Sequence, residues 1–326
     1  MSKKIAVLTS GGDAPGMNAV VRSVVRAGID AGLDVFGIRK GYNGLLTGDI
    51  VPMSLRSVTD IIHRGGTILY TARSPRFNSP EGVKAAADQC RAMGIDGVVV
   101  VGGDGSFRGA RDLTNAGIPC IAIPGTIDND IASSEYTVGY DTAMNTAMEM
   151  VDRLRDTSAS HNRCSVVEVM GRRCGDIALN TGIAVGATAI LVPEVPYDFQ
   201  RDVVDRIRHT QSTGRQHFII VVAEGCSSVA GNDINEMARR IQEATGVETR
   251  ATVLGHVQRG GSPTLRDRVV ASQMGCHAVD LLMEGKSNRV VVMQKGLITD
   301  FDITEALNMP RTFDYKLYND AMRISI

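Results

Sequence analysis

Three glycine-rich segments of the chain combine small residues with carboxylates, a pattern typical of phosphate chemistry. Residues 10–19 read Ser-Gly-Gly-Asp-Ala-Pro-Gly-Met-Asn-Ala, residues 102–106 read Gly-Gly-Asp-Gly-Ser, and residues 124–130 read Pro-Gly-Thr-Ile-Asp-Asn-Asp. Small residues let phosphate oxygens approach backbone N–H groups, most favourably where a helix begins. The first segment matches neither the Walker pattern nor the dinucleotide fingerprint, and a tight turn that binds nothing is its alternative.

Carboxylates in the second and third segments suggest two separate tasks. Asp104 would repel a phosphate unless it held a cation, so we predict that it binds Mg²⁺, with a helix N-cap as the alternative. Transfer of a phosphoryl group to an alcohol needs a base for the hydroxyl proton. Asp128 or Asp130, which share a face if the chain is extended, could be that base, and the other would orient the substrate. A structural Asx-turn is the alternative for this pair.

Short apolar runs that alternate with amphipathic stretches must position these segments. The runs cover residues 5–9, 97–101, 120–123, 165–170, 190–192 and 218–223. This alternation predicts an α/β fold with largely parallel sheets, whose ligands bind beyond the carboxyl ends of the strands. Each glycine-rich segment directly follows one of the first three runs. A helical stretch over 142–154 leads into the polar passage 155–162, where we expect a connection between two domains.

Length and composition favour two domains and exclude several classes of partner. The chain has 326 residues, 43% of them hydrophobic, and its 35 basic and 36 acidic residues give a net charge of -1. This balance offers no broad attraction to nucleic acid or membranes, and no run approaches a transmembrane span or a signal peptide. The six cysteines form no CxxC pair, which favours reduced thiols in a cytoplasmic protein.

Five motifs together resemble those of the bacterial ATP-dependent 6-phosphofructokinases, in order and spacing and over essentially the whole chain. They are residues 11–18, 102–106, 124–130, 170–172 (Met-Gly-Arg) and 255–262 (Gly-His-Val-Gln-Arg-Gly-Gly-Ser). The resemblance implies a phosphofructokinase fold of two Rossmann-like lobes. It also implies a cytoplasmic glycolytic kinase that uses Mg-ATP to phosphorylate the C1 hydroxyl of fructose 6-phosphate, and a homotetramer with shared active sites.

The same resemblance implies roles for individual residues. Catalysis falls to Asp128 as the base and to Arg172, Thr126 and Asp130, while Asp104 belongs to the magnesium site. The residues implied for ATP are Gly12, Arg73, Ser74, Gly103, Asp104, Gly105 and Ser106. Those implied for fructose 6-phosphate are Thr126, Asp128, Met170, Gly171, Arg172, Glu224, His256 and Arg259, with Arg163 and Arg250 reaching the 6-phosphate of a neighbouring subunit.

Two glycines bear on the phosphoryl donor. Relatives that use pyrophosphate carry an aspartate where this chain has Gly105 and a lysine where it has Gly125. We expect the two glycines to leave open the space that the α-phosphate of ATP needs, and therefore predict ATP as the donor.

An effector site for ADP or phosphoenolpyruvate is also implied, but in altered form. The residues that match it are Arg22, Arg26, Asp60, Arg155, Gly186 and Arg215. Thr188 replaces a glutamate, Leu55 stands where an arginine can occur, and Thr213 and Gln216 lie in a stretch with fewer lysines. Fewer charges should weaken the binding of phosphorylated effectors, so we expect weakened or changed regulation.

The resemblance places the ATP lobe at 1–138 plus 251–301 and the fructose 6-phosphate lobe, which should form a cleft with it, at 139–250 plus 302–326. Four alternatives remain open. They are a pyrophosphate-dependent enzyme, a kinase for another sugar phosphate such as tagatose 6-phosphate, a nucleotide-dependent oxidoreductase, and a non-catalytic nucleotide sensor. The last two would leave the carboxylates and arginines without a task.

Overall fold

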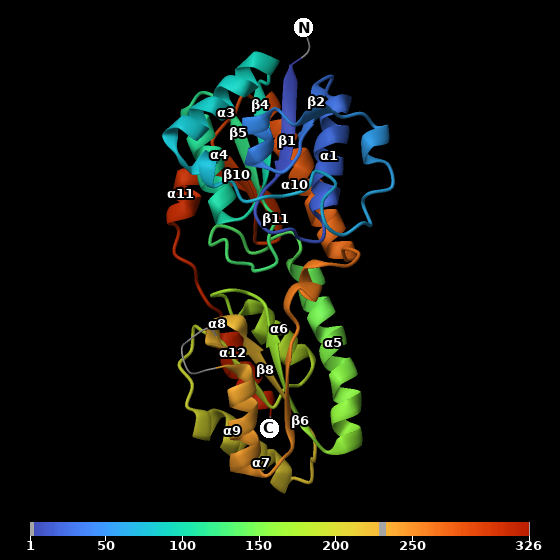
Figure 1. The fold of residues 1–326 in the computed structure, drawn as a ribbon, viewed down its shortest axis with the longest axis vertical. Coiled ribbons are helices and arrows are strands. Elements are labelled where there is room, and N and C mark those ends of the chain that lie inside the picture. Colours follow the sequence, from blue (N-terminus) through green and yellow to red (C-terminus); the bar gives the residue numbers. More distant parts are fainter. Residues whose placement is uncertain (1–2, 228–232, 326) are drawn as a thin grey trace. The chain divides into compact units, whose positions relative to one another are not determined.

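The chain divides into two units, each with its own sheet of largely parallel strands (Figure 1). The computed structural model describes residues 3–227 and 233–325. Unit 1 contains residues up to 127 together with 131–142 and 259–311, and unit 2 contains 128–130, 143–258 and 312–326. The predicted α/β class with largely parallel sheets is confirmed.

Unit 1 is built on a seven-stranded sheet with the order β11-β10-β5-β4-β1-β2-β3. The strands are β1 (Lys4–Thr9), β2 (Asp34–Ile38), β3 (Ile50–Pro52), β4 (Gly97–Gly102), β5 (Cys120–Pro124), β10 (Arg289–Gln294) and β11 (Leu297–Asp302). Only β3 and β11, at the two edges, pair antiparallel with their neighbours. The central strands are continuous apolar runs because helices cover both faces of the sheet.

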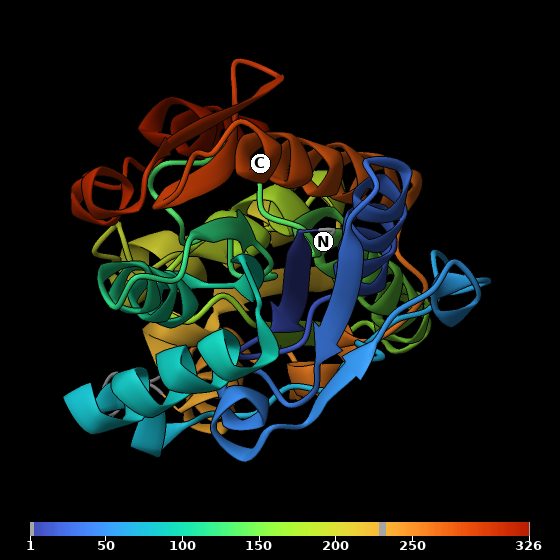
Figure 2. The same cartoon turned by 90° about the horizontal axis from the view of Figure 1, so that it is seen from above.

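Helices form the outer layers of unit 1 (Figure 2). On one face the buried side chains of the sheet pack with those of α2 (Tyr42–Thr47), α3 (Pro80–Met93), α4 (Asp104–Asn115) and α11 (Ile303–Asn308). The other face contacts α1 (Met17–Asp30) and α10 (Leu265–Met283), which also pack against each other. The short helices η1 (Arg56–Val58) and η2 (Pro75–Asn78) lie in the connections.

Unit 2 contains a four-stranded parallel sheet with the order β7-β8-β6-β9. Its strands are β6 (Cys164–Val169), β7 (Ala189–Leu191), β8 (Phe218–Ala223) and β9 (Thr249–Val253). Its helices are α6 (Asp176–Ala184), η3 (Gln200–Val204), α7 (Asp205–Ser212), α8 (Glu224–Ser227), α9 (Ile234–Thr245), η4 (Gly255–Arg259) and α12 (Tyr315–Ile324). Side chains of η3, α7 and α9 close one hydrophobic core against this sheet.

Helix α5 (Tyr140–His161) corrects the prediction of a connecting passage at 155–162. The passage contains no glycine or proline, so the helix continues to His161 and ends before Asn162, which has a φ of 53°. The buried Ser158 hydroxyl bonds that of Ser165 at 2.6 Å. The unit boundaries also differ from the predicted ones. Strand β9 pairs with β6 in unit 2, and α11 packs on α4 in unit 1, so the chain changes units near 142, 258 and 311 instead.

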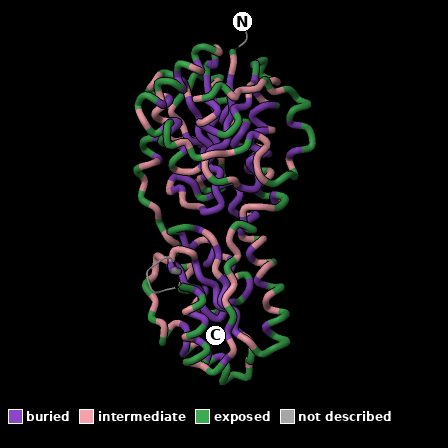
Figure 3. The backbone as a smooth tube through the Cα atoms, viewed as in Figure 1, coloured by how far each residue is buried: buried purple, intermediate pink, exposed green. Residues whose placement is uncertain are grey.

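Buried residues concentrate in the strands and on the inner helix faces (Figure 3). All six cysteines are free thiols, and five of them are buried. Burial raises the pKa of Cys90 to about 11 and the pKa values of Cys164 and Cys226 to about 12, so these thiols stay protonated at neutral pH. Among the described residues, no helix is long and apolar enough to cross a membrane.

Candidate active site

The three glycine-rich segments follow three adjacent strands of unit 1, at the same edge of the sheet. Strands β1, β4 and β5 are parallel neighbours, so residues 10–16, 103–106 and 125–127 leave the sheet side by side. The loop of the first segment ends at Gly16, the N-cap of α1, which has a φ of 102°. The second ends at the first turn of α4. Two helix N-termini, with their partial positive charge, thus lie next to these segments.

The first and second segments are in backbone contact. The Ser10 N–H donates to the Val101 carbonyl at 2.9 Å. A Cβ on Gly102 would lie 2.5 Å from the Ser10 carbonyl oxygen and 2.4 Å from the Ser106 hydroxyl, which only glycine avoids. The buried Ser106 in turn accepts a hydrogen bond at its carbonyl from the Tyr42 hydroxyl at 2.6 Å. We call residues 10–16 and 102–106 together the phosphate cradle.

The segment that carries Arg73 and Ser74 is tied to the cradle. The Thr9 hydroxyl donates to the Tyr70 carbonyl at 2.8 Å, and the Thr71 hydroxyl donates to the Gly11 carbonyl at 2.7 Å. Arg73 is exposed. The Ser74 Oγ is buried and has no hydrogen-bond partner within the part of the chain that the structure describes. The predicted ATP residues in both segments therefore belong to one region of unit 1.

Asp104 is the first residue of α4, whose N-cap position is taken by Gly103. Its carboxylate is 46% exposed and pairs with the Arg108 guanidinium, one turn later, at 3.2 Å. The described residues contain no group of three His, Cys, Asp or Glu side chains that could hold a metal. A single accessible carboxylate suits Mg²⁺, which commonly takes one protein carboxylate, several waters and the oxygens of a bound phosphate.

The turn after Thr126 differs from the extended chain that was expected. Residues 127 and 128 form a turn, and Asn129 is left-handed with a φ of 50°, so Asp128 and Asp130 do not share the face of a strand. The Asn129 amide donates to the Asp176 carboxylate at 3.0 Å, which fixes this turn in unit 2. Asp128 is only 2% exposed, whereas Asp130 is half-buried. Burial distinguishes the two carboxylates that the sequence left equivalent.

Asp128, Arg172 and Glu224 form one cluster in unit 2. The Arg172 Nε lies 3.3 Å from the Asp128 carboxylate. The backbone N–H of Arg172 donates to the Glu224 carboxylate at 3.3 Å. Arg172 is held in a tight turn after β6, with a φ of 54°, and Gly171 has a φ of 137°. A Cβ on Gly171 would lie 2.5 Å from the Cys174 carbonyl oxygen, so the turn requires glycine there.

Two residues that were not predicted complete this part of the site. The fully buried Gln258 accepts the Met170 N–H at 2.9 Å and thereby joins two of the sequence motifs. Glu248 pairs with both Arg163, at 2.9 Å, and Arg250, at 2.7 Å. Hydrogen bonds from Arg163 and Arg250 hold the pKa of Glu248 below its ordinary value. The register of β6 and β9, which pairs Cys164 with Thr249, brings Arg163 to Glu248, whereas Arg250 lies two residues after Glu248 in the chain.

Arg259 lies at the phosphate cradle. Its Nη1 donates to the Asp13 carbonyl at 3.1 Å, and a Cβ on Gly12 would lie 2.6 Å from the same nitrogen. The predicted partner of Arg259 in sugar phosphate binding, His256, is exposed and belongs to unit 2. The glycine at position 12 thus makes room for a guanidinium, a role that the sequence did not suggest.

The residues of the implied effector site fall into two sets. Arg22, Arg26 and Asp60 belong to unit 1, and Arg155, Gly186 and Arg215 belong to unit 2. In unit 2 the Arg155 guanidinium donates to the Val185 carbonyl. Burial, followed by repulsion from Arg155, lowers the pKa of Arg215. Thr188 is fully buried, whereas Leu55 is 46% exposed.

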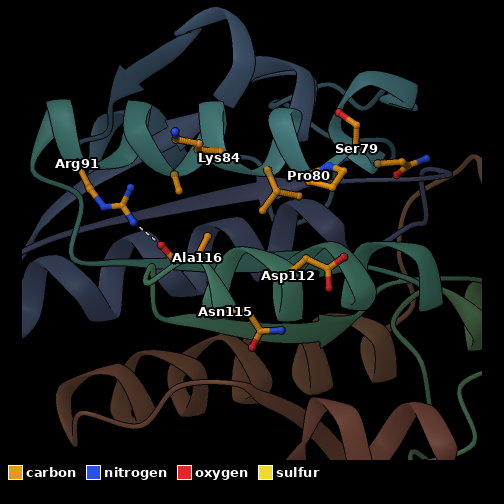
Figure 4. Close-up of a pocket in the computed structure, with 10 residues that line it drawn as sticks. Ser79, Pro80, Lys84, Arg91, Asp112, Asn115 and Ala116 are labelled. Atoms are coloured by element: carbon orange, nitrogen blue, oxygen red, sulfur yellow. Dashed lines mark hydrogen bonds between the residues drawn. The ribbon is translucent and has the colours of Figure 1, made fainter.

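A separate groove lies between α3 and α4 (Figure 4). It has a volume of about 560 Å³ and is lined by residues 78–80, 83, 84, 87, 91, 112, 115 and 116. None of the predicted site residues lines this groove.

The two donor-selecting glycines are not equivalent. A Cβ on Gly105 would meet no atom within 4 Å, as expected for open space. A Cβ on Gly125 would lie 2.9 Å from Val101 Cγ1 and 3.2 Å from Met17 Cε, so the expected open space is absent there. Both neighbours are fully buried and have little freedom to move away.

Gly125→Lys is therefore expected to lower the free energy of unfolding by about 1–3 kcal/mol through overpacking. Gly105→Asp, in the first turn of α4, should leave the free energy of unfolding unchanged or raise it slightly, because a carboxylate is favourable at a helix N-terminus. Urea denaturation of the two variants measures both effects, and an equal loss in both would contradict the difference in packing.

Comparison with known proteins identifies the family. The family model described as Phosphofructokinase matches residues 4–282. The chain belongs to the phosphofructokinase family. Among its relatives in this family, the ATP-dependent 6-phosphofructokinase of Clostridium tetani is 55% identical over 323 residues, which cover 99% of each chain. That of Clostridium botulinum strain Hall is 53% identical with the same coverage.

Solved phosphofructokinases share the fold. The structure of phosphofructokinase from Saccharomyces cerevisiae matches with a TM-score of 0.87 and 35% identity, and it covers 100% of this chain and 48% of the yeast chain. The pyrophosphate-dependent phosphofructokinase from Marinobacter aquaeolei matches with a TM-score of 0.84 and 20% identity, covering 99% of this chain and 91% of that one. The expected phosphofructokinase fold is confirmed.

Proposed function

We propose that the chain transfers the γ-phosphoryl group of ATP to the C1 hydroxyl of fructose 6-phosphate, which gives fructose 1,6-bisphosphate and ADP in the cytoplasmic pathway of glycolysis. The observation that carries the proposal is the buried Asp128 carboxylate beside the Arg172 guanidinium, with the backbone N–H of Arg172 bound to Glu224. The ATP-dependent relatives that are 53–55% identical over nearly the full length support the choice of reaction.

Asp128 serves as the base in this reaction. The C1 hydroxyl oxygen attacks the γ-phosphorus, its proton passes to the Asp128 carboxylate, and the bond to the β–γ bridging oxygen breaks as ADP leaves. The Arg172 guanidinium, 59% exposed and 3.3 Å from that carboxylate, stabilises the charge on the transferred group. Thr126 and Asp130 orient the substrate.

Unit 1 binds the donor in this proposal. The phosphate cradle, through Gly12, Gly103, Gly105 and Ser106, and the attached Arg73 and Ser74 hold ATP. Asp104 holds Mg²⁺, which neutralises the phosphate oxygens when bound.

Unit 2 binds most of the sugar phosphate. Met170, Gly171, Arg172, Glu224 and His256, all in unit 2, contact the sugar. The motif at residues 255–262 assigns Arg259 to the phosphate of the sugar. Arg163 and Arg250, both held by Glu248, serve the 6-phosphate bound to a neighbouring subunit of a homotetramer.

Asp104→Asn is expected to raise the Mg²⁺ concentration for half-maximal activity by about tenfold or more, because a charged ligand oxygen is lost. Initial rates against Mg²⁺ at fixed ATP measure this. Arg108→Gln is the matched control, since it removes the ion-pair partner and keeps the carboxylate. The same Mg²⁺ requirement in both variants would refute the metal assignment.

A coupled assay that compares donors and acceptors tests the proposed function as a whole. We expect ADP-linked turnover with Mg-ATP and fructose 6-phosphate, and none with pyrophosphate. Turnover with pyrophosphate but not with ATP would show that pyrophosphate is the donor. Faster turnover with tagatose 6-phosphate than with fructose 6-phosphate would show that tagatose 6-phosphate is the acceptor. Binding of ATP with no turnover on either sugar would instead support a nucleotide sensor.

Regulation by ADP or phosphoenolpyruvate is expected to be weak. Thr188 supplies no carboxylate and is fully buried, and Leu55 is apolar. We predict that either effector changes the apparent affinity for fructose 6-phosphate by less than about fivefold, the low end of usual allosteric coupling. Saturation curves with and without each effector measure it, and strong activation by ADP would contradict the prediction.

A further inference from the structure

Asp267 is a fully buried carboxylate outside the predicted site. It lies in the first turn of α10 and accepts four hydrogen bonds within unit 1. Its Oδ1 accepts from the Tyr136 hydroxyl at 2.5 Å and from the Gly139 N–H at 2.7 Å. Its Oδ2 accepts from the N–H of Thr142 at 2.9 Å and from the Thr142 hydroxyl at 2.5 Å. A buried carboxylate is tolerated only with such full pairing.

These bonds make Asp267 a cap for another helix. Gly139 and Thr142 lie at the N-terminus of α5, whose unpaired N–H groups Asp267 satisfies. The contact is reciprocal, because Thr264, the N-cap of α10, donates its hydroxyl to Asp141 at 2.6 Å and its N–H to the Thr142 hydroxyl at 3.0 Å. The starts of α5 and α10 are thereby fixed to each other.

The segment that Asp267 holds, residues 136–139, touches the third glycine-rich segment. The Val138 N–H donates to the Pro124 carbonyl at 2.9 Å, and Val138 forms a parallel bridge with Gly125. The Thr137 hydroxyl donates to the Thr126 carbonyl at 2.6 Å. The chain that leads into the Asp128 turn is therefore braced by residues 136–139.

The same segment also touches the phosphate cradle. A Cβ on Gly139 would lie 2.6 Å from Ala14 Cβ and 3.2 Å from the Pro15 carbonyl oxygen. A Cβ on Gly16 would lie 2.7 Å from Val138 Cγ1 and 3.6 Å from Asp267 Cβ. Residues 136–139 thus pack against both the first and the third glycine-rich segments.

We propose that Asp267 is a positioning residue for phosphoryl transfer, which sets the phosphate cradle and Thr126 in register by holding residues 136–139 between them. The proposal rests on the proposed function, since the two segments are assigned there to donor and acceptor. Asp267 itself touches neither substrate. Small displacements of reacting groups are costly in rate, so a residue of this kind acts mainly on kcat.

Asp267→Asn tests the proposal, because the amide keeps the size of the side chain and cannot accept at both positions. Either the Gly139 N–H or the Thr142 N–H then loses its acceptor. We expect kcat to fall by about 10- to 100-fold, with the KM values for ATP and fructose 6-phosphate changed by less than about threefold. Assays run well below the unfolding midpoint, with the folded fraction checked by circular dichroism, exclude a loss of folded protein.

A double-mutant cycle separates positioning from a general loss of stability. Thr137→Val removes the bond to the Thr126 carbonyl and is predicted to lower kcat by the same route. The double variant should then lose less kcat than the product of the two single losses. Should Asp267→Asn fail to fold, Tyr136→Phe, which removes one bond to the same carboxylate, takes its place in the cycle.

Asp302→Ala is the matched control, because Asp302 caps α11 in the same unit and accepts from Thr304 and Glu305. It should lower the unfolding midpoint and leave kcat unchanged. A normal kcat in Asp267→Asn, or fully multiplicative losses in the cycle, would contradict the positioning role. Turnover by the wild-type protein would still support the proposed function in that case. Absence of turnover in the wild type would instead overturn the proposed function.

Discussion

Replacing Asp128 with asparagine is expected to lower kcat by about 100-fold or more, because the amide cannot take up the proton of the attacking hydroxyl. The change keeps the shape of a side chain that is only 2% exposed, so the KM values and the fold should be little affected. Single-turnover measurements with Mg-ATP and fructose 6-phosphate would separate loss of the chemical step from loss of binding.

Asp130→Asn is the matched comparison for this variant. Both residues lie in the third glycine-rich segment and both lose only a charge, but Asp130 is half-buried and Asp128 is nearly inaccessible to water. We expect the smaller loss of kcat in Asp130→Asn. If that variant lost more activity than Asp128→Asn, the base would have to be reassigned to Asp130.

Removing the Arg172 side chain is expected to lower kcat by about 100- to 1,000-fold, the usual effect of losing a donor that stabilises charge in the transition state. Both Arg172→Gly and Arg172→Ala should show this loss. Arg172→Lys should recover only part of the activity, since an ammonium cannot reproduce the planar pair of donors. Rates at saturating substrates measure all three variants.

The backbone at Arg172 adds a second readout. Its φ of 54° suits glycine better than alanine, and both variants lose the same ion pair with Asp128. Arg172→Gly should therefore be more stable than Arg172→Ala by about 1 kcal/mol in urea denaturation. Equal stability would show that this turn stores no strain, whereas unequal kcat values would point to a disturbed turn instead of a lost donor.

The sequence was sufficient for the sheets and for the positions of the glycine-rich segments, because buried parallel strands are apolar runs and their ligand residues follow at once. Asp104 and the pair of Asp128 and Asp130 stood out for the same reason, and the resemblance chose Asp128 from the pair. The length of α5 was not predicted because the polar residues 155–161 are compatible with both a helix and a loop.

Other features depend on contacts between distant residues. Glu248 pairs with Arg250 within its own segment, and it reaches Arg163 only because β6 and β9 are neighbours in register. Asp267 resembles an ordinary acidic residue at a helix start until Tyr136 and Thr142 are brought to it. The sequence suggests open space at Gly125, whereas in the fold a Cβ added to this glycine would contact Val101 and Met17. Such features follow from packing, which no local pattern encodes.

The contact of Gly102 with Ser10 and Ser106 has an energetic consequence for the donor site. Because the two halves of the phosphate cradle already touch through their backbones, folding fixes their N–H groups before any ligand arrives. A triphosphate that binds there pays little conformational entropy for ordering the protein, so more of the energy of its contacts remains as affinity. A larger residue at position 102 would separate the two halves of the cradle. Ordering them again on binding would cost entropy and lower the affinity for the triphosphate.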